Sequence, residues 1–98
     1  MPDMAKERAV RTILASVGRG GLNRSEDVRL VQELLNRHIR PPQPLLVVNG
    51  VVDSRTVAAL EAFQRRVVQR HRPDGRVDPG SPTFVALASQ AAQPSQPH

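Results

Sequence analysis

Two aspartates occupy equivalent places in a pattern that the sequence contains twice. Asp53 lies in VNGVVDSRTVAAL and Asp78 in DGRVDPGSPTFVAL. Two carboxylates can hydrolyse a glycosidic bond when they lie about 5 to 9.5 Å apart beside a sugar-binding cleft. The chain has only two aromatic residues, Phe63 and Phe84, so a platform for sugar rings is missing. A carboxylate that begins a helix is more often a cap, and the repeat therefore favours a scaffold over an active site.

Other catalytic or metal sites lack the residues that they need. His38, His71 and His98 are dispersed, and the chain has no cysteine, which argues against a metal site. No nucleophile-elbow sequence is present. The glycines from Gly18 to Gly21 have no phosphate-loop context and are expected to end a helix. The sequence therefore predicts no catalytic residue, no metal and no cofactor, and thus a protein that is not an enzyme.

The basic residues are the remaining candidates for chemistry. The net charge is +5, from 14 Lys and Arg against 9 Asp and Glu. Several arginines gather in the second half of the chain, together with His71: Arg65, Arg66, Arg70, Arg72 and Arg76. They form either a solvated face or a surface for an anionic polymer, because arginine binds carboxylates in a bidentate fork and also suits phosphates. The shortage of aromatic residues argues against single-stranded nucleic acid.

The length and composition limit the architecture. A chain of 98 residues with 39% hydrophobic residues suits one compact domain. No apolar run reaches the roughly 20 residues that a membrane-spanning helix needs, so no membrane partner is expected. The charged N-terminus is not a secretory signal. We expect a monomer that stays in the cytoplasm, leaves it by a route that needs no such signal, or is part of a longer chain.

Four helical segments are expected to position these residues. The first runs from a cap at Asp3 to Val17, with Val10, Ile13, Leu14 and Val17 on one face. The second begins at a cap formed by Asn23 or Ser25 and carries a stripe from Val28 to Ile39. The Pro41–Pro44 segment ends it, and residues 45–48 should then pack as an extended segment.

The third and fourth helices begin within the two copies of the repeat. Asp53 or Ser54 caps the third helix, whose inward face carries Phe63 and Ala59 and which ends by Arg72 because Pro73 follows. Ser81 caps the fourth, with Pro82 at its first position and Phe84, Leu87 and Ala88 facing inward. In each copy a glycine, Gly50 or Gly75, is expected where the turn needs positive φ.

The fold class that follows is all-α. We expect a small three-helix bundle with an extra N-terminal helix and short extended or turn segments. Residues 1–22 hold the N-terminal helix and its glycine-rich turn, residues 23–89 form the main domain, and residues 90–98 form a disordered Pro/Gln tail. Phe63 should be a central core residue.

The order of the motifs resembles the type-1, repeat-built family of peptidoglycan-binding domains. The similarity is carried by Asp27-Val28-x-x-Val31-Gln32-x-x-Leu35, Asn49-Gly50, Thr56-x-x-Ala59-Leu60-x-x-Phe63-Gln64, Asp74-Gly75-x-Val77 and Thr83-x-x-x-Leu87. It spans about residues 23–88. The chain departs from the family pattern at Val52, where an aromatic residue is frequent, and at Asp53-Ser54, where Gly-Pro is frequent.

The resemblance implies a non-catalytic module that binds peptidoglycan and directs an associated cell-wall hydrolase or secreted effector. The candidate ligand-binding residues lie near the first turn and along the basic third helix: Asn49, Asp53, Ser54, Arg55, Arg66 and Arg70. Two alternatives remain open at this point. One is a protein-adaptor domain on the same scaffold, and the other is a basic domain that binds nucleic acid.

Overall fold

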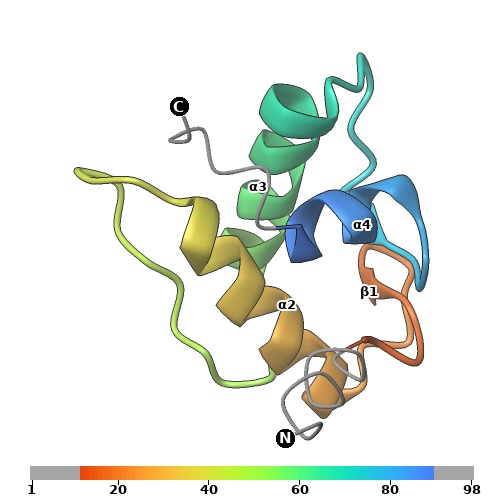
Figure 1. The fold of residues 1–98 in the computed structure, drawn as a ribbon. Helices are drawn as coiled ribbons and strands as arrows, with labels where there is room; N and C mark the ends of the chain where they lie inside the picture. The colour runs from red at the N-terminus through yellow and green to blue at the C-terminus, as the bar shows by residue number, and fades with distance from the viewer. Residues whose placement is uncertain (1–11, 90–98) are drawn as a thin grey trace, which may run out of the picture.

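The computed structural model describes residues 12–89 as a small helical fold with one short antiparallel pair of strands (Figure 1). The elements in chain order are β1 (Val17–Gly18), α2 (Ser25–His38), α3 (Ser54–Phe63), the π-helical turn η1 (Gln64–Val68), β2 (Arg76–Val77) and α4 (Pro82–Ala88). The predicted all-α class with three main helices is confirmed for the described residues, and their one pair of two-residue strands is a small addition to it. Within residues 12–89, no helix is long and apolar enough to cross a membrane.

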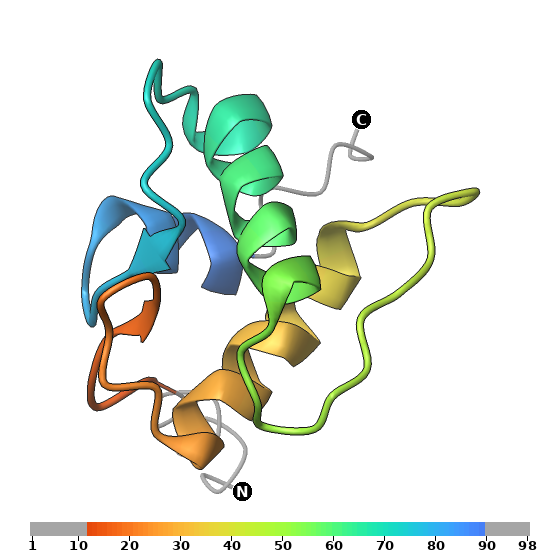
Figure 2. The same cartoon turned by 180° about the vertical axis from the view of Figure 1, so that it is seen from behind.

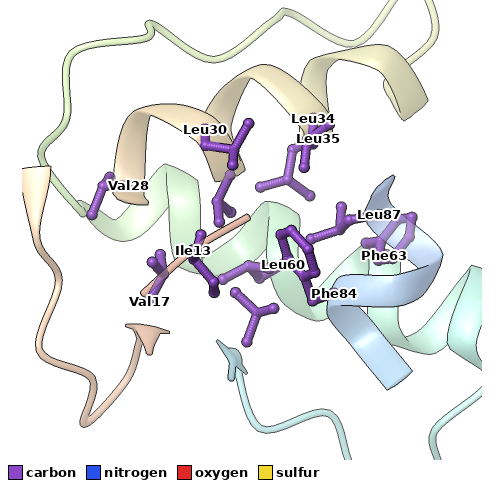
Figure 3. Close-up of a cluster of buried hydrophobic side chains, with 12 residues drawn as sticks. Ile13, Val17, Val28, Leu30, Leu34, Leu35, Leu60, Phe63, Phe84 and Leu87 are labelled. Atoms are coloured by element: carbon purple, nitrogen blue, oxygen red, sulfur yellow. The ribbon is translucent and has the colours of Figure 1, made fainter. Parts of the chain in front are cut away.

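The core collects apolar side chains from all three α-helices, from β2 and from the segment that precedes α2. Figure 3 shows these side chains pointing into one shared interior. The buried set comprises Ile13, Val17, Val28, Leu30, Val31, Leu34, Leu35, Leu60, Phe63, Val77, Phe84 and Leu87. Phe63 is 1% exposed, so its predicted place in the core is confirmed. Ala88, which was expected to face inward, is exposed at the last position of α4.

Side-chain caps begin two of the helices as predicted. The Asp53 carboxylate accepts a hydrogen bond from the Thr56 backbone N–H at 2.9 Å, and the Ser81 hydroxyl accepts one from the Phe84 backbone N–H at 3.2 Å. Such caps satisfy donors that have no partner within the helix. Pro82 follows Ser81 at the start of α4, where a missing N–H costs nothing.

The predicted cap of α2 is wrong. Its N-cap residue is Arg24, which makes no side-chain capping bond. Asn23 instead has φ of 58° and closes the preceding turn, because its side chain accepts from the Gly18 N–H at 2.7 Å and donates to the Gly18 carbonyl at 3.2 Å. Asparagine tolerates this left-handed backbone better than most residues do. The Asn23 side chain therefore forms its hydrogen bonds within the turn and does not cap α2.

The predicted N-terminal helix is wrong over its described part, residues 12–17, which are not helical. The backbone N–H groups of Leu14 and Ala15 donate to the buried Asp27 carboxylate at 3.0 and 3.1 Å, and Val17 pairs with Val77 of β2. Leu14 is 66% exposed. These tertiary partners satisfy the backbone in place of helical hydrogen bonds. The rest of that helix, and the tail expected from residue 90, lie outside the described residues.

The segment between α2 and α3 arches away from the helices before it returns to the start of α3 (Figure 2). The expectation that residues 45–48 pack inward is wrong for most of them, since Leu45 and Val47 are 62% and 66% exposed. Leu46 alone of the four packs against the core. Its backbone N–H and carbonyl bond the Asn36 side chain at 2.8 and 3.0 Å, which ties the arch to α2.

A buried glutamine organises each copy of the repeat. In the first copy, Gln32 is 1% exposed. Its side-chain oxygen accepts from the N–H groups of Asn49 and Gly50, each at 3.0 Å. Its side-chain nitrogen donates to the Val51 carbonyl and to the Thr56 hydroxyl, each at 3.1 Å. One side chain therefore joins α2, the turn and the start of α3.

Gln64 repeats this arrangement in the second copy and is fully buried. Its oxygen accepts from the Gly75 N–H at 2.9 Å, and its nitrogen donates to the Arg76 carbonyl at 3.1 Å and the Thr83 hydroxyl at 3.3 Å. Gly50 and Gly75 have φ of 77° and 66°, as predicted. A Cβ atom at Gly50 would also lie 2.6 Å from the Ser25 hydroxyl oxygen. The positive φ therefore favours glycine at both turns, and the close approach of Ser25 adds a steric reason at Gly50.

Replacing Gln64 by leucine should destabilise the fold by at least about 2 kcal/mol. Leucine has a similar size but forms no hydrogen bond, so the partners of Gln64 lose theirs, and each buried unsatisfied polar group costs about 1–3 kcal/mol. Urea denaturation measures the change. Gln43→Leu is the matched control, because Gln43 is exposed and should unfold at nearly the original midpoint. Equal midpoints for the two variants would show that the buried amide is dispensable.

Candidate ligand-binding groove

The six residues proposed from the sequence fall in three different places, and all six are exposed. Asn49, Asp53 and Ser54 lie at the turn and the start of α3. Arg55 and Arg66 line a groove on the outer side of α3. Arg70 lies beyond η1, where its guanidinium is 3.8 Å from the Asp74 carboxylate. Of the six, the structure therefore places only Arg55 and Arg66 in the lining of the groove.

The side chains of Asn49 and Asp53 serve the local turn. Asn49 accepts from the Val51 N–H at 3.0 Å and from the Gln32 side chain at 3.3 Å. Asp53 accepts from both the backbone N–H and the hydroxyl of Thr56, at 2.9 and 3.0 Å. These hydrogen bonds, the backbone one first, hold the pKa of the Asp53 carboxyl below its usual value. Both side chains thus stabilise the scaffold on which any ligand site would rest.

The groove lies between the segment of residues 39–46 and the outer face of α3, and it has a volume of about 1000 Å³. The lining residues come from these two segments and from the middle of η1. They are Ile39, Arg40, Gln43, Pro44, Leu45, Leu46, Arg55, Ala58, Ala59, Ala62 and Arg66. Because the segment of residues 39–46 arches away from the helices, the groove is open to solvent.

The lining combines small apolar groups with cations. Three alanines of α3, Ala58, Ala59 and Ala62, lie along the groove, and apolar side chains such as Leu45 face them from the opposite segment. Three arginines supply the charge: Arg40, Arg55 and Arg66. No acidic or aromatic residue occurs among the lining residues of the described chain. The groove is therefore suited to an anionic ligand that also carries small apolar groups.

Arg66 is held at the end of α2. Its guanidinium donates to the His38 backbone carbonyl at 3.4 Å, and His38 is the last residue of α2. The His38 ring meets Phe63 edge to face, with 4.9 Å between ring centroids, and its Nε2 lies 3.2 Å from the Leu87 carbonyl. The position of Arg66 is thus linked to the packed core, and its guanidinium keeps further donors for a ligand.

The other arginines that gather in the second half of the sequence lie apart from the groove. Arg76 donates to Asp78 at 3.0 Å, and Arg70 is near Asp74. Arg65 and Arg72 are exposed and do not line the groove. The arginine-rich segment of the sequence is therefore divided in the fold, and only Arg66 of that segment lines the groove.

The two aspartates of the repeat have separate structural roles. Asp53 caps α3, whereas Asp78 accepts hydrogen bonds from the Ser16 hydroxyl and from Arg76. Within residues 12–89, no group of three His, Cys, Asp or Glu side chains could hold a metal ion. The carboxylates that the sequence offered for acid–base chemistry are thus engaged in helix capping and in contacts between neighbouring segments.

Most of the groove was missed by the sequence reasoning. Arg40, Leu45 and the outward alanines were not proposed as site residues. One signal was available, because Ala58 and Ala62 are four residues apart and so share a helix face, away from the Leu60 and Phe63 face. The proline-rich stretch before Leu45 predicted the end of α2, but the path of this segment beside α3 follows only from the fold.

Comparison with protein families gives one match. A family model described as a putative peptidoglycan binding domain matches residues 24–80, which is more than half of the chain. The matched region contains both buried glutamines and both glycine turns, together with every residue that lines the groove. No curated protein and no solved structure matches the chain.

The cap of α3 should give the fold a pH-dependent stability. Because the folded-state pKa of Asp53 is lowered, its contribution is complete above the unfolded pKa of about 3.9 and is lost as the pH falls through the folded value. Thermal melts should show that Asp53→Ala lowers the Tm at pH 7, and that the difference from the unmodified protein shrinks below about pH 4.

Asp53→Ser is the matched control, since serine caps helices without a charge. It should recover most of the Tm at pH 7 and keep its advantage over Asp53→Ala at low pH. A Tm difference between the unmodified protein and Asp53→Ala that stays constant from pH 7 to pH 3 would contradict this role for the carboxylate.

Proposed function

The chain belongs to the peptidoglycan-binding domain family. We propose that it is a non-catalytic module that binds part of the peptidoglycan polymer in the groove between residues 39–46 and α3. Family membership supports peptidoglycan as the ligand. In the groove, three arginines and several apolar side chains line one hollow of the described surface. We propose that its guanidinium groups are the main ligand contacts.

The observation that carries this proposal is the convergence of Arg40, Arg55 and Arg66 on a groove without an acidic lining residue. Peptidoglycan carries carboxylates on its peptide stems, and a guanidinium binds a carboxylate through two parallel hydrogen bonds. Arginine also loses less freedom than lysine for each hydrogen bond formed, because its planar fork is preorganised. Of the six candidates from the sequence, Arg55 and Arg66 are retained as ligand contacts, and Asn49, Asp53, Ser54 and Arg70 are assigned to the surrounding scaffold and surface.

The proposed biological role is targeting. The module would concentrate an associated cell-wall hydrolase or a secreted effector on its polymeric substrate, at the cell wall or in the periplasm. The use of Asp53 and Asp78 in structural contacts supports a role in binding and not in hydrolysis. An adaptor that binds another protein, and a domain that binds nucleic acid, remain as outcomes of the test.

Removing the groove arginines should weaken retention on insoluble peptidoglycan. The double variant Arg55→Gln/Arg66→Gln should lose about tenfold in affinity at 0.1 M salt, which corresponds to about 1.4 kcal/mol. The difference should shrink at 1 M salt, because the Debye length falls from about 10 Å to about 3 Å. Co-sedimentation with purified cell walls measures the retained fraction.

Arg65→Gln is the matched control, because Arg65 is exposed and does not line the groove. It should bind walls as the unmodified protein does, and thermal melts should show that all variants are folded. An equal loss in Arg65→Gln would indicate a diffuse charge effect. Submicromolar affinity for duplex DNA at physiological salt without wall retention would favour the nucleic-acid alternative, and binding to neither polymer would favour the adaptor.

The isolated chain should not hydrolyse cell walls. No arrangement of the described carboxylates presents an acid–base pair to the groove, because acidic residues are absent from its lining. The turbidity of a purified wall suspension should therefore stay constant during incubation with the protein, whereas lysozyme clears the same suspension. Reproducible clearing that Asp53→Asn abolishes, with the fold intact by circular dichroism, would overturn the assignment.

A further inference from the structure

We propose that the groove binds the stem peptides of peptidoglycan, through their carboxylates and alanine methyl groups, and does not bind the glycan strand. This inference rests on the proposed function and specifies its ligand. It depends on three features of the groove: the absence of a platform for sugar rings, the spacing of the arginines along α3, and the small size of the side chains between them.

The groove lacks the groups that usually hold a sugar. Carbohydrate rings are commonly bound by stacking on an aromatic face, and none of the lining residues is aromatic. The chain contains neither Trp nor Tyr, and Phe63 and Phe84 are buried in the core at 1% and 7% exposure. Sugar hydroxyls also pair well with carboxylates and amides, but Gln43 is the single side chain of that kind among the described lining residues.

The arginines are spaced for an extended peptide. Arg55 and Arg66 are eleven residues apart along α3 and η1, which is roughly 16 Å of helix axis at 1.5 Å per residue. An extended peptide advances about 3.3–3.6 Å per residue, so four or five residues would reach from one guanidinium to the other. Stem peptides have this length and carry carboxylates at their ends and side chains. Arg40 would meet the ligand from the opposite wall.

The surface between the two arginines accepts small apolar groups. Ala58 and Ala62 are exposed on α3, so the helix backbone can be approached closely there. Leu45 faces them from the other segment and is 62% exposed without a ligand. Alanine methyl groups of a stem peptide fit such a shallow apolar strip, whereas the hydroxyl groups of a sugar would find no hydrogen-bond partner on it.

The test is a competition assay on intact insoluble peptidoglycan. An amidase that cuts between the glycan and the stem peptide yields two soluble competitors, free stem peptides and bare glycan strands. Stem peptides should displace the protein at a concentration at least tenfold lower than that of glycan strands in equivalent repeat units. Stem peptides whose carboxylates are converted to methylamides should compete at least tenfold more weakly than the unmodified peptides.

The site is located with the same peptides by methyl NMR. Unmodified stem peptides should shift the methyl signals of Ala58 and Ala62, and Arg55→Gln/Arg66→Gln should weaken this binding at least tenfold. Arg65→Gln should leave it unchanged, because that residue lies outside the groove. Thermal melts of both variants establish that they are folded.

The outcomes separate this inference from the proposed function. Retention on intact peptidoglycan that glycan strands abolish and stem peptides do not would overturn the stem-peptide assignment and leave wall binding intact. Equal competition by free and methylamidated peptides would overturn the role of the carboxylates. If the folded protein is not retained on intact peptidoglycan at all, the proposed function itself fails.

Discussion

The fold depends on two buried glutamine side chains that each join a helix to a distant turn. Gln32 and Gln64 satisfy backbone groups of the glycine turns and the hydroxyls of Thr56 and Thr83. A turn held only by its own backbone would leave these groups without partners in a nearly dry interior. Because each glutamine bonds the start of the following helix, it also fixes the relative placement of successive helices in a core with only two aromatic residues.

The groove is a consequence of this placement. Gln32 bonds the start of α3, and Asn36 of the same helix bonds Leu46. Both walls of the groove, α3 and the segment of residues 39–46, are therefore positioned by hydrogen bonds to α2. Arg66 is tied to the last residue of α2 as well. Meanwhile the carboxylates of Asp27 and Asp53 bond backbone N–H groups. These two carboxylates therefore serve local hydrogen bonds, whereas arginines without an acidic neighbour in the lining supply the charge of the groove, which suits an anionic ligand.

The sequence by itself determined the features that depend on local chemistry. The caps at Asp53 and Ser81, the positive φ of Gly50 and Gly75, and the burial of Phe63 were all predictable. Each involves residues within about one helical turn or one apolar face, where side-chain geometry and periodicity decide the outcome. The order of the motifs also predicted the family, because the glutamine, glycine and threonine positions recur at fixed spacing.

The tertiary structure decided what depends on contacts between distant segments. Residues 12–17 carry a helical apolar pattern, yet their backbone is not helical, because it forms hydrogen bonds with the Asp27 carboxylate and pairs with β2. Asn23 could have capped α2, but it closes a turn with Gly18 instead. The groove joins Arg40 to Arg55 and Arg66 across a segment whose path no local signal specifies. A local pattern gives the conformation that a segment prefers, and the partners available in the folded chain decide whether that preference is kept.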